Sequence, residues 1–173
     1  MTNSSFEKNI GIIGLGVLGS AIAENFINKN ISINGYDINK KVFEKIKSDK
    51  IKVYDSIDKI SRNCNFLITS LPSESSLINI CKSLITKDNL IIIETSTLPL
   101  DCKLEARNIL LEKNITIFDA PLSGNRIAAL EGKLSAYLSG DYKNKEEVQK
   151  ILDVFCQKVT DVGYFGNGTI MKL

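Results

Sequence analysis

Histidine is missing from this sequence of 173 residues. Its absence excludes Ser-His-Asp and Cys-His nucleophilic catalysis, and it excludes zinc sites with histidine ligands. Any proton transfer must therefore use lysine, tyrosine, aspartate, glutamate or water. Cysteine is sparse: Cys64, Cys81, Cys102 and Cys156 lie far apart and form no CxxC or Cys/His metal spacing. We expect four free, mostly buried thiols in a reducing cytoplasm, and no metal site.

Long apolar runs and an excess of charge of one sign are missing too. No uninterrupted apolar stretch reaches the roughly 20 residues that a membrane helix needs. The N-terminal MTNSSFEKN lacks the basic and apolar regions of a secretory signal. The 22 basic and 20 acidic residues give a net charge of +2, so we expect no nucleic-acid partner and no membrane-surface role. A hydrophobic content of 43% with 24% charged residues indicates an ordinary globular protein.

A glycine-rich motif near the N-terminus is the strongest signal present. An apolar run ends at Ile13, a helix-like stretch follows the glycines, and a second β-branched run ends at Asp37. A GxGxxG between strand and helix, with an acid closing the next strand, predicts a dinucleotide site. A βαβ unit whose glycines serve packing alone is the alternative. The motif consists of Gly14, Leu15, Gly16, Val17, Leu18 and Gly19.

Each part of this motif has a mechanical role. Gly14 permits the tight turn, Gly16 lets the backbone approach a pyrophosphate, and Gly19 allows close packing of helix on strand. The helix N-terminus offers free N–H groups and a positive dipole end to the phosphates. Asp37, which lies 18 residues after Gly19, can accept hydrogen bonds from the adenosine ribose hydroxyls. A 2′-phosphate there would meet like charge, so Asp37 favours NAD over NADP.

Short apolar runs alternate with amphipathic segments along the chain, which is typical of a parallel sheet covered by helices. We expect a single α/β domain of the Rossmann type, doubly wound, with a mostly parallel sheet of about eight strands. The expected strands are 9–14, 31–36, 51–54, 65–71, 90–95, 115–119, 134–139 and 158–164, and the expected helices are 17–29, 39–48, 56–62, 74–86, 99–113 and 144–157.

In open α/β sheets, ligands bind beyond the carboxyl ends of the strands, and three further features fall there. Leu71 and Pro72 follow the fourth strand, where cofactor contact and a proline at the first position of a helix are both open. Ser96 and Thr97 follow the fifth strand; their hydroxyls can bind a nicotinamide or a ribose, and Thr97 is equally a candidate helix N-cap. The segment 119–124 follows the sixth strand, and its small residues and backbone N–H groups can hold a substrate carboxylate.

With these features the chain resembles the β-hydroxyacid dehydrogenases. This family includes 3-hydroxyisobutyrate dehydrogenase and tartronate semialdehyde reductase, with 6-phosphogluconate dehydrogenase as a more distant relative. The resemblance spans almost the whole chain and rests on four motifs in the same order. They are the glycine motif at 12–19, with Leu18 where methionine is usual; the Ser96-Thr97 pair; the segment 119–124, continuing to 132–134; and the G-x-G-x-x-x-K stretch at 166–172.

The resemblance implies an NAD-dependent oxidoreductase that interconverts a small 3-hydroxy acid and its semialdehyde by hydride transfer. Lys172 then serves as proton donor or acceptor at the substrate oxygen, and Thr97 lies near the nicotinamide. Ser123, Gly124 and Asn125 bind the substrate. From spacing alone Lys172 is one more solvated lysine, and only the family pattern assigns it this role. A non-catalytic NAD-binding or interaction module is the alternative function.

The loop after Ser123 departs from the family pattern. The family usually has a second glycine after Ser-Gly, where this chain has Asn125 followed by Arg126. Asparagine tolerates the left-handed backbone region better than most residues, so we expect the loop to keep its shape. We hypothesise that Arg126 makes a bidentate contact with an acidic or doubly charged substrate. A salt bridge to a surface carboxylate is the commoner fate of an arginine.

The sequence given reaches Leu173, where members of the family continue into a long helix and an all-helical second domain. We expect an NAD-binding Rossmann domain over 1–165 and, over 166–173, the start of the linker helix to an absent C-terminal domain. As a free chain it is expected to bind NAD with weak or no turnover. An exposed apolar face, on which two copies pair or the missing domain docks, is expected around Tyr164, Phe165, Ile170 and Met171.

Overall fold

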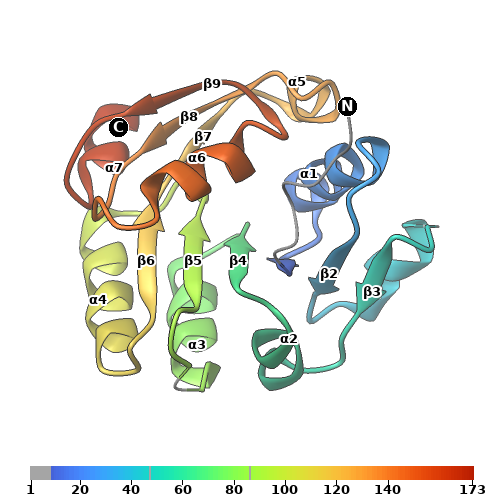
Figure 1. The fold of residues 1–173 in the computed structure, drawn as a ribbon, viewed down its shortest axis with the longest axis horizontal. Helices are drawn as coiled ribbons and strands as arrows, with labels where there is room; N and C mark the ends of the chain where they lie inside the picture. The colour runs from blue at the N-terminus through green and yellow to red at the C-terminus, as the bar shows by residue number, and fades with distance from the viewer. Residues whose placement is uncertain (1–8, 47, 86) are drawn as a thin grey trace.

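The structure, a computed structural model, describes residues 9–46, 48–85 and 87–173 (Figure 1). The N-terminal segment 1–9 is the one in which no secretory signal is expected. Its residues 1–8 lie outside the described residues. Residues 47 and 86, which belong to two expected helices, also lie outside them. Strands and helices alternate along the described chain as far as residue 119, as the hydrophobic pattern predicts.

Six parallel strands form the main sheet, and all pairings between neighbours are parallel. Their order, β3-β2-β1-β4-β5-β6, is that of a doubly wound Rossmann sheet, so the predicted α/β class is confirmed. The order reverses between β1 and β4, where the crossovers leave in opposite directions and open a crevice. The strands are β1 (Ile10–Ile13), β2 (Ile33–Tyr36), β3 (Ile51–Val53), β4 (Phe66–Thr69), β5 (Ile91–Glu94) and β6 (Thr116–Asp119).

Both faces of this sheet are covered, and each central strand contributes to two separate cores. In β4, Phe66 and Ile68 join the core on one face, whereas Leu67 joins the core on the other. This burial on two sides explains why the central strands are continuous apolar runs in the sequence. The first face carries α1 (Val17–Asn28), and the second carries α2 (Ile57–Asn63), α3 (Glu74–Ser83) and α4 (Leu100–Leu111).

A second, three-stranded sheet lies over the face that α1 covers (Figure 1). We expected about eight strands in one sheet, whereas the described residues form nine strands in two sheets. The additional strand β7 has only 2 residues, too few to show an alternating pattern. The remaining elements are β7 (Leu122–Ser123), α5 (Arg126–Leu130), β8 (Leu134–Leu138), α6 (Lys145–Leu152), β9 (Cys156–Asp161) and α7 (Asn167–Lys172).

Three expected elements differ from the structure. The helix expected over 39–48 is the 3-10 helix η1 (Lys40–Lys45), in which bonds between residues three apart replace the α-helical ladder. The helix expected over 144–157 ends at Leu152, because the next three residues form turns. The last strand therefore begins at Cys156 rather than at residue 158, and it ends at Asp161.

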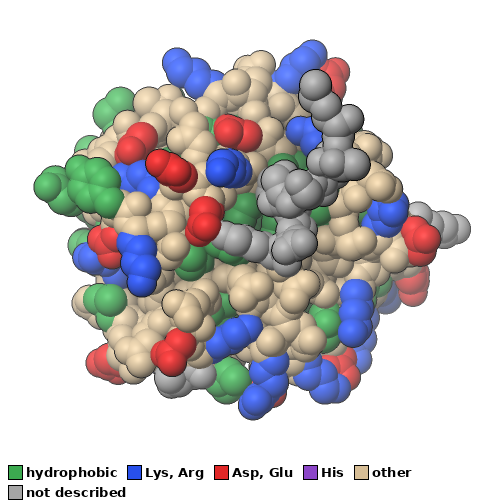
Figure 2. All heavy atoms as spheres, in the orientation of Figure 1, with side chains coloured by type: hydrophobic (Ala, Val, Ile, Leu, Met, Phe, Trp, Pro, Cys, Tyr) green, Lys and Arg blue, Asp and Glu red, His purple; other side chains and the backbone are tan. Residues whose placement is uncertain are grey.

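No helix among the described residues is long and apolar enough to cross a membrane. Within residues 9–46, 48–85 and 87–173, no group of acidic and cysteine side chains is arranged to hold a metal ion. Figure 2 shows acidic and basic side chains interspersed on one face of the molecule. The cytoplasmic setting stays a prediction.

Candidate functional site

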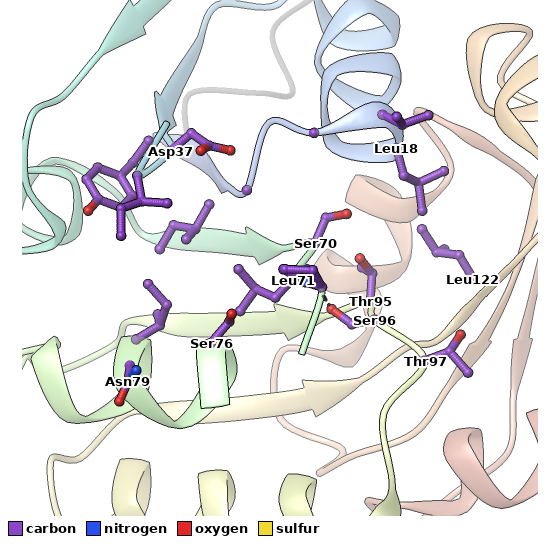
Figure 3. A pocket seen from close by; sticks show the side chains of 18 residues that line it. Leu18, Asp37, Ser70, Leu71, Ser76, Asn79, Thr95, Ser96, Thr97 and Leu122 are labelled. Atoms are coloured by element: carbon purple, nitrogen blue, oxygen red, sulfur yellow. Dashed lines mark hydrogen bonds between the residues drawn. The ribbon is translucent and has the colours of Figure 1, made fainter. Parts of the chain in front are cut away.

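A cavity of about 520 Å³ opens at the carboxyl ends of the strands, beside the glycine loop (Figure 3). It lies at the reversal of strand order between β1 and β4, where doubly wound sheets bind dinucleotides. Asp37 and Asn79 lie toward one end of it, and Thr97 and Leu122 lie toward the other. The lining residues are Ile13, Gly14, Gly16, Val17, Leu18, Tyr36, Asp37, Ile38, Ser70, Leu71, Pro72, Ser76, Asn79, Ile80, Thr95, Ser96, Thr97 and Leu122.

The three glycines of the loop are required for different reasons. Gly14 has a φ of +91°, and a Cβ on it would overlap the carbonyl oxygen of Ser70. A Cβ on Gly19 would overlap the carbonyl oxygen of Gly14, so Gly19 brings α1 close to the strand. A Cβ on Gly16 would meet nothing within 4 Å, so the protein itself leaves open space there. This space lies at the N-cap of α1, which no side chain caps, and it fits a pyrophosphate group.

Asp37 borders the cavity and holds the loop beside it. Its Oδ2 accepts the N–H of Leu15 at 2.7 Å, and its Oδ1 accepts the N–H of Asn39 at 2.7 Å. A carboxylate has about four acceptor positions, so about two stay available for ribose hydroxyls. The side chain of Leu15 is buried in the core and does not line the cavity. Leu15 thus acts on the site through its backbone.

Leu71 and Pro72, which follow β4, both line the cavity. The helix α3 takes Ser73 as its N-cap, so Pro72 precedes the helix and does not occupy its first position. The alternative of a proline at that position is therefore wrong. Leu71 is tied to the next loop, because its N–H donates to Oγ of Ser96 at 2.8 Å. The two loops form one wall of the cavity.

Thr97 is exposed at the cavity, at the end opposite Asp37. The N-cap of α4 is Pro99, so the interpretation of Thr97 as a helix cap is wrong. Neighbouring Ser96 is buried and also lines the cavity. The Ser-Thr pair therefore offers one hydroxyl that is engaged with the protein and one that faces the open space.

The side of the cavity that α3 forms was missed in the sequence. Ser76, Asn79 and Ile80 lie on one face of that helix, at positions i, i+3 and i+4. Their spacing within the expected helix 74–86 puts them on one face, but the sequence does not show that this face borders the cavity. Tyr36 was missed as well, although it comes just before Asp37 at the end of β2. The other lining residues without a prior assignment are Ile38, Ser70 and Thr95, whereas Ile13 belongs to the motif 12–19 and Leu122 to the segment 119–124.

The segment expected to bind substrate follows β6, and of its residues 119–124 only Leu122 lines this cavity. Ser123 ends β7, and Gly124 is exposed with a φ of +137°. Asn125 has a φ of −101°, so its tolerance of the left-handed region is not used here, and Gly124 takes the positive φ. Oδ1 of Asn125 caps α5 by accepting the N–H three residues on, at 3.0 Å. Arg126 is exposed, and within the described part of the chain its guanidinium makes no hydrogen bond or ion pair.

Lys172 lies in the last turn of α7 and is half-buried. Among the described residues its ammonium forms no hydrogen bond and no ion pair. The helix begins after Gly166, whose φ of +94° suits glycine and which offers no capping side chain. A Cβ on Gly168 would overlap the carbonyl oxygen of Tyr137, so this glycine lets α7 approach β8 closely. The two glycines of the G-x-G-x-x-x-K stretch therefore place the helix that carries Lys172.

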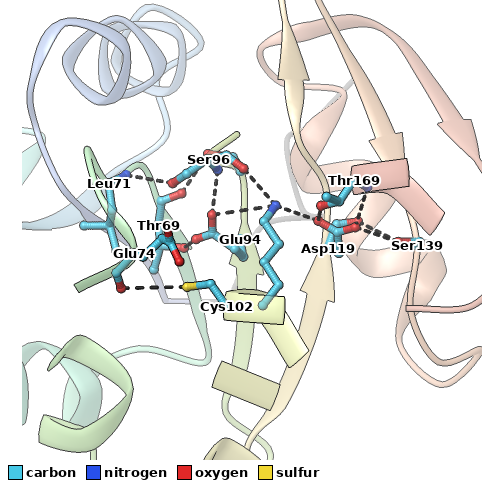
Figure 4. A network of polar contacts seen from close by, with 11 residues as sticks. Thr69, Leu71, Glu74, Glu94, Ser96, Cys102, Asp119, Ser139 and Thr169 are labelled. Atoms are coloured by element: carbon cyan, nitrogen blue, oxygen red, sulfur yellow. Dashed lines mark hydrogen bonds and ion pairs between the residues drawn. The ribbon is translucent and has the colours of Figure 1, made fainter. Parts of the chain in front are cut away.

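A buried polar network joins the loop of Ser96 to α7 (Figure 4). Lys103 of α4 is 0% exposed and donates to the carbonyl oxygen of Ser96 at 2.7 Å and to Oδ1 of Asp119 at 2.7 Å. Asp119 is also 0% exposed, and it accepts the N–H of Thr169 at 2.8 Å and its hydroxyl at 3.0 Å. Oγ of Ser139 donates to Oδ2 of Asp119 at 3.2 Å. The ammonium of Lys103 thus bonds the cavity wall at Ser96 directly, and it is linked to α7 through the carboxylate of Asp119.

Glu94 is the third ionisable group of this network. Its Oε1 accepts the N–H of Ser96 at 2.7 Å, and its Oε2 is hydrogen-bonded to the hydroxyl of Thr69. The Lys103 ammonium lies 3.9 Å away. Burial raises the pKa of Glu94 above its ordinary value of 4.5, against the opposing effects of Lys103 and of the hydrogen bonds from Thr69 and Ser96. Lys103 therefore pairs mainly with Asp119, which is closer.

Known proteins match this chain along most of its length. The family model described as the NAD binding domain of 6-phosphogluconate dehydrogenase matches residues 9–163. Mitochondrial 3-hydroxyisobutyrate dehydrogenase of Drosophila melanogaster is 28% identical over 177 residues, covering 100% of this chain and 54% of the relative. The 2-(hydroxymethyl)glutarate dehydrogenase of Eubacterium barkeri is 24% identical over 179 residues, covering 96% of this chain and 58% of the relative.

A solved structure shows the same fold. The 3-hydroxyisobutyrate dehydrogenase of Mycobacterium tuberculosis with L-serine has a TM-score of 0.90 at 20% identity, covering 95% of this chain and 57% of that chain. The present chain thus spans between 54% and 58% of the length of these three proteins. Their remaining length has no counterpart in the sequence given.

Proposed function

This chain belongs to the family of the NAD binding domain of 6-phosphogluconate dehydrogenase, and from that membership we propose a specific activity to which it contributes the nucleotide-binding part. The proposed activity is the NAD-dependent interconversion of a small 3-hydroxy acid and its semialdehyde. The names of two relatives, 3-hydroxyisobutyrate dehydrogenase and 2-(hydroxymethyl)glutarate dehydrogenase, support a hydroxy acid as the substrate class.

One observation carries the nucleotide assignment: the open space at Gly16. The protein packs tightly against Gly14 and Gly19 but leaves the position of a Gly16 side chain empty, so the glycine serves a ligand rather than the fold. The helix N-terminus at that point favours a negatively charged group. The cavity continues from there to Asp37 on one side and to Thr97 on the other. This extent suits the two halves of a dinucleotide.

Asp37 supports a preference for NAD over NADP. Its carboxylate keeps acceptor positions for the 2′- and 3′-hydroxyls of the ribose, whereas a 2′-phosphate would face like charge at the same place. Titration calorimetry of this chain with NAD and with NADP tests the preference. Tighter binding of NADP would contradict it.

Lys172 is proposed to exchange the proton of the reaction. NAD, held along the cavity from Asp37 to Thr97, would supply the acceptor for the hydride, and oxidation of the hydroxy acid would also release the hydroxyl proton of the substrate. The ammonium of Lys172 makes no bond within the described part of the protein, so its amine form is free to take that proton and its ammonium form to return it in the reverse direction. Ser123 and Gly124 are proposed to hold the substrate carboxylate, together with Asn125.

Arg126 supports a substrate with a second negative charge. Its guanidinium is exposed beside the proposed substrate segment and is not paired with any described carboxylate. The variant Arg126→Ala, measured in the longer protein that carries the rest of the relatives' length, is expected to raise KM for a dicarboxylic substrate. An unchanged KM would reject the role of Arg126 and leave the dehydrogenase proposal standing.

We propose that turnover needs the part of the relatives' length that this chain does not cover. An apolar surface supports the contact: Tyr164, Ile170 and Met171 are 76%, 59% and 60% exposed. Phe165 is half-buried under the guanidinium of Arg107, 5.3 Å from its ring centroid, and contributes less. Pairing of two copies through the same surface is the other outcome, which sedimentation of the chain would reveal. Rapid NAD reduction by the chain alone would contradict the need for a further part.

A further inference from the structure

The structure assigns a positioning role to Lys103. We propose that its ammonium keeps the cavity wall at Ser96 and the helix of Lys172 in one fixed arrangement. The inference rests on the proposed function, because it concerns how the nicotinamide side of the cavity and the lysine that exchanges the proton stay in register. Lys103 acts through other groups, and it lines no part of the cavity itself.

The cost of burying Lys103 is the first argument. The side chain is 0% exposed, among two carboxylates that are also 0% exposed. The free-energy cost of removing an ammonium and a carboxylate from water offsets most of their mutual attraction. Well-packed apolar residues therefore often stabilise a protein equally well. What an apolar side chain cannot do is bond two separate elements at defined distances. The arrangement of the bonds, rather than their contribution to stability, distinguishes this lysine.

The first of the two elements is the loop after β5. Lys103 donates to the carbonyl oxygen of Ser96 at 2.7 Å, while Oγ of the same serine accepts the N–H of Leu71 at 2.8 Å. The position of Ser96 therefore sets the positions of both loops that form the cavity wall. Ser96 and Leu71 both line the cavity.

The second element is α7. Its N-cap Gly166 has no side chain to bond the first N–H groups of the helix. Oδ2 of Asp119 takes that place by accepting the N–H of Thr169, and Oδ1 accepts the hydroxyl of the same residue. Thr169 precedes Lys172 by three residues, about one helical turn. Lys103 holds the Asp119 carboxylate at 2.7 Å. The orientation of that carboxylate thus affects the position of Lys172, one turn after Thr169.

The variant Lys103→Met tests this role, because methionine has a similar length and cannot donate. The readout is amide hydrogen exchange at Leu71 and Thr169, the two N–H groups that the network holds, compared with Ile12 in the central strand β1. Exchange at Ile12 follows unfolding of the whole domain. We expect exchange at Leu71 and at Thr169 to accelerate at least tenfold more than exchange at Ile12.

Lys113→Met, in the turn that follows the C-terminal end of α4, is the matched control. Its ammonium also bonds backbone carbonyls, those of Cys81, Lys82 and Leu84 at 2.8, 2.6 and 2.5 Å, but it lies away from the cavity. This variant is expected to accelerate exchange at neither Leu71 nor Thr169 beyond the change at Ile12. Calorimetry then separates positioning from stability: NAD is expected to bind at least tenfold more weakly to Lys103→Met and unchanged to Lys113→Met.

If Lys103→Met does not fold, the double variant Lys103→Met/Asp119→Asn replaces it, since no unpaired carboxylate stays buried there. In it, Leu71 is still expected to exchange faster relative to Ile12, because the bond to Ser96 is lost. Equal acceleration at Leu71, Thr169 and Ile12 in Lys103→Met would overturn the positioning role, and so would acceleration at one of the first two alone. If the unaltered chain does not bind NAD, the proposed function fails, while the exchange pattern still decides the role of Lys103.

Discussion

The backbone N–H of Leu15 donates to Oδ2 of Asp37 at 2.7 Å, across 22 positions of the sequence. The carboxylate at the end of β2 therefore shapes the glycine loop after β1 as well as facing the cavity. Because a hydrogen bond to a charged acceptor contributes about 1.5–3 kcal/mol, this bond is a substantial part of what holds the loop. A substitution of Asp37 is therefore expected to affect both nucleotide binding and the geometry of the glycine loop.

Asp37→Ala is expected to weaken NAD binding about ten- to a hundredfold, which corresponds to about 1.4–2.8 kcal/mol. NADP binding is expected to fall less, because the change also removes the repulsion of the 2′-phosphate. Calorimetry with both nucleotides measures the two constants. Asp55→Ala, which removes an exposed carboxylate after the neighbouring strand β3, is the control and is expected to bind both nucleotides like the unaltered chain. An unchanged ratio of NAD to NADP affinity in Asp37→Ala would contradict the role of this carboxylate.

Alanine at Gly16 and at Gly19 is expected to affect different properties. A Cβ on Gly16 enters open space, so Gly16→Ala should change the free energy of unfolding by less than about 1 kcal/mol while weakening NAD binding. A Cβ on Gly19 overlaps the carbonyl oxygen of Gly14, so Gly19→Ala should cost about 1–3 kcal/mol or more. Urea unfolding and calorimetry, applied to both variants, measure the two effects. Unchanged NAD affinity in Gly16→Ala would show that no ligand occupies the space.

The four thiols are expected to be unreactive in the folded protein. All are buried, and burial raises the pKa of Cys64, Cys81 and Cys156 to about 12 each and raises that of Cys102 as well. At pH 8 a thiol with a pKa of about 12 is ionised in about one molecule in ten thousand. Ellman's reagent should therefore react slowly with the native chain and completely after addition of guanidinium. Fast reaction of a thiol in the native chain would contradict this expectation, because it would show that the structure around that cysteine opens locally.

Glu94→Gln is expected to become increasingly more stable than the unaltered protein as pH rises. The folded pKa of Glu94 lies above the ordinary value of 4.5, chiefly because of burial, so the protonated carboxyl is the form that folding favours. Its contribution is fully present below pH 4.5 and is lost as pH rises through the folded pKa. Glutamine has an acceptor oxygen and an NH2 group with two N–H donors, and it does not titrate in this range.

Urea unfolding at several pH values from 4.5 upward measures the difference between the two proteins. Glu24→Gln, a change at an exposed glutamate of α1, is the control for the loss of one carboxylate from the chain. A stability difference for Glu94→Gln that stays constant with pH, or that shrinks as pH rises, would contradict the effect of burial on this group.

Periodicity and glycine chemistry explain what the sequence could predict. The central strands β4 and β5 are buried on both faces, so they appear as unbroken apolar runs such as Phe66-Leu67-Ile68. The glycine loop could be predicted because its backbone geometry excludes a Cβ at Gly14 and Gly19, whichever side chains surround it. Both signals are local, and local signals are visible in one sequence.

The rest depends on contacts between distant residues. Lys103 in a helical pattern looks like any surface lysine, and only the fold shows that it is buried against Asp119, 16 positions away. The helix face with Asn79 and Ile80 could be predicted as a helix, but not its orientation toward the cavity. Asparagine is a residue type that often occurs in left-handed turns, yet the side chain of Asn125 caps the helix α5. With 5 residues, α5 is too short to show a helical hydrophobic pattern in the sequence. Tertiary contacts decided each of these positions.

The way in which α7 is capped makes its first turn depend on two distant strands. Its capping groups are Ser139 and Asp119, which precede the bonded residues by 29 and 50 positions. Asp119 ends β6, Ser139 follows β8, and the two residues pair with each other in an isolated bridge. The N–H groups of Gly168 and Thr169 therefore keep their acceptors only while β6 and the end of β8 stay together. Local opening between these two strands would expose both N–H groups to solvent at once.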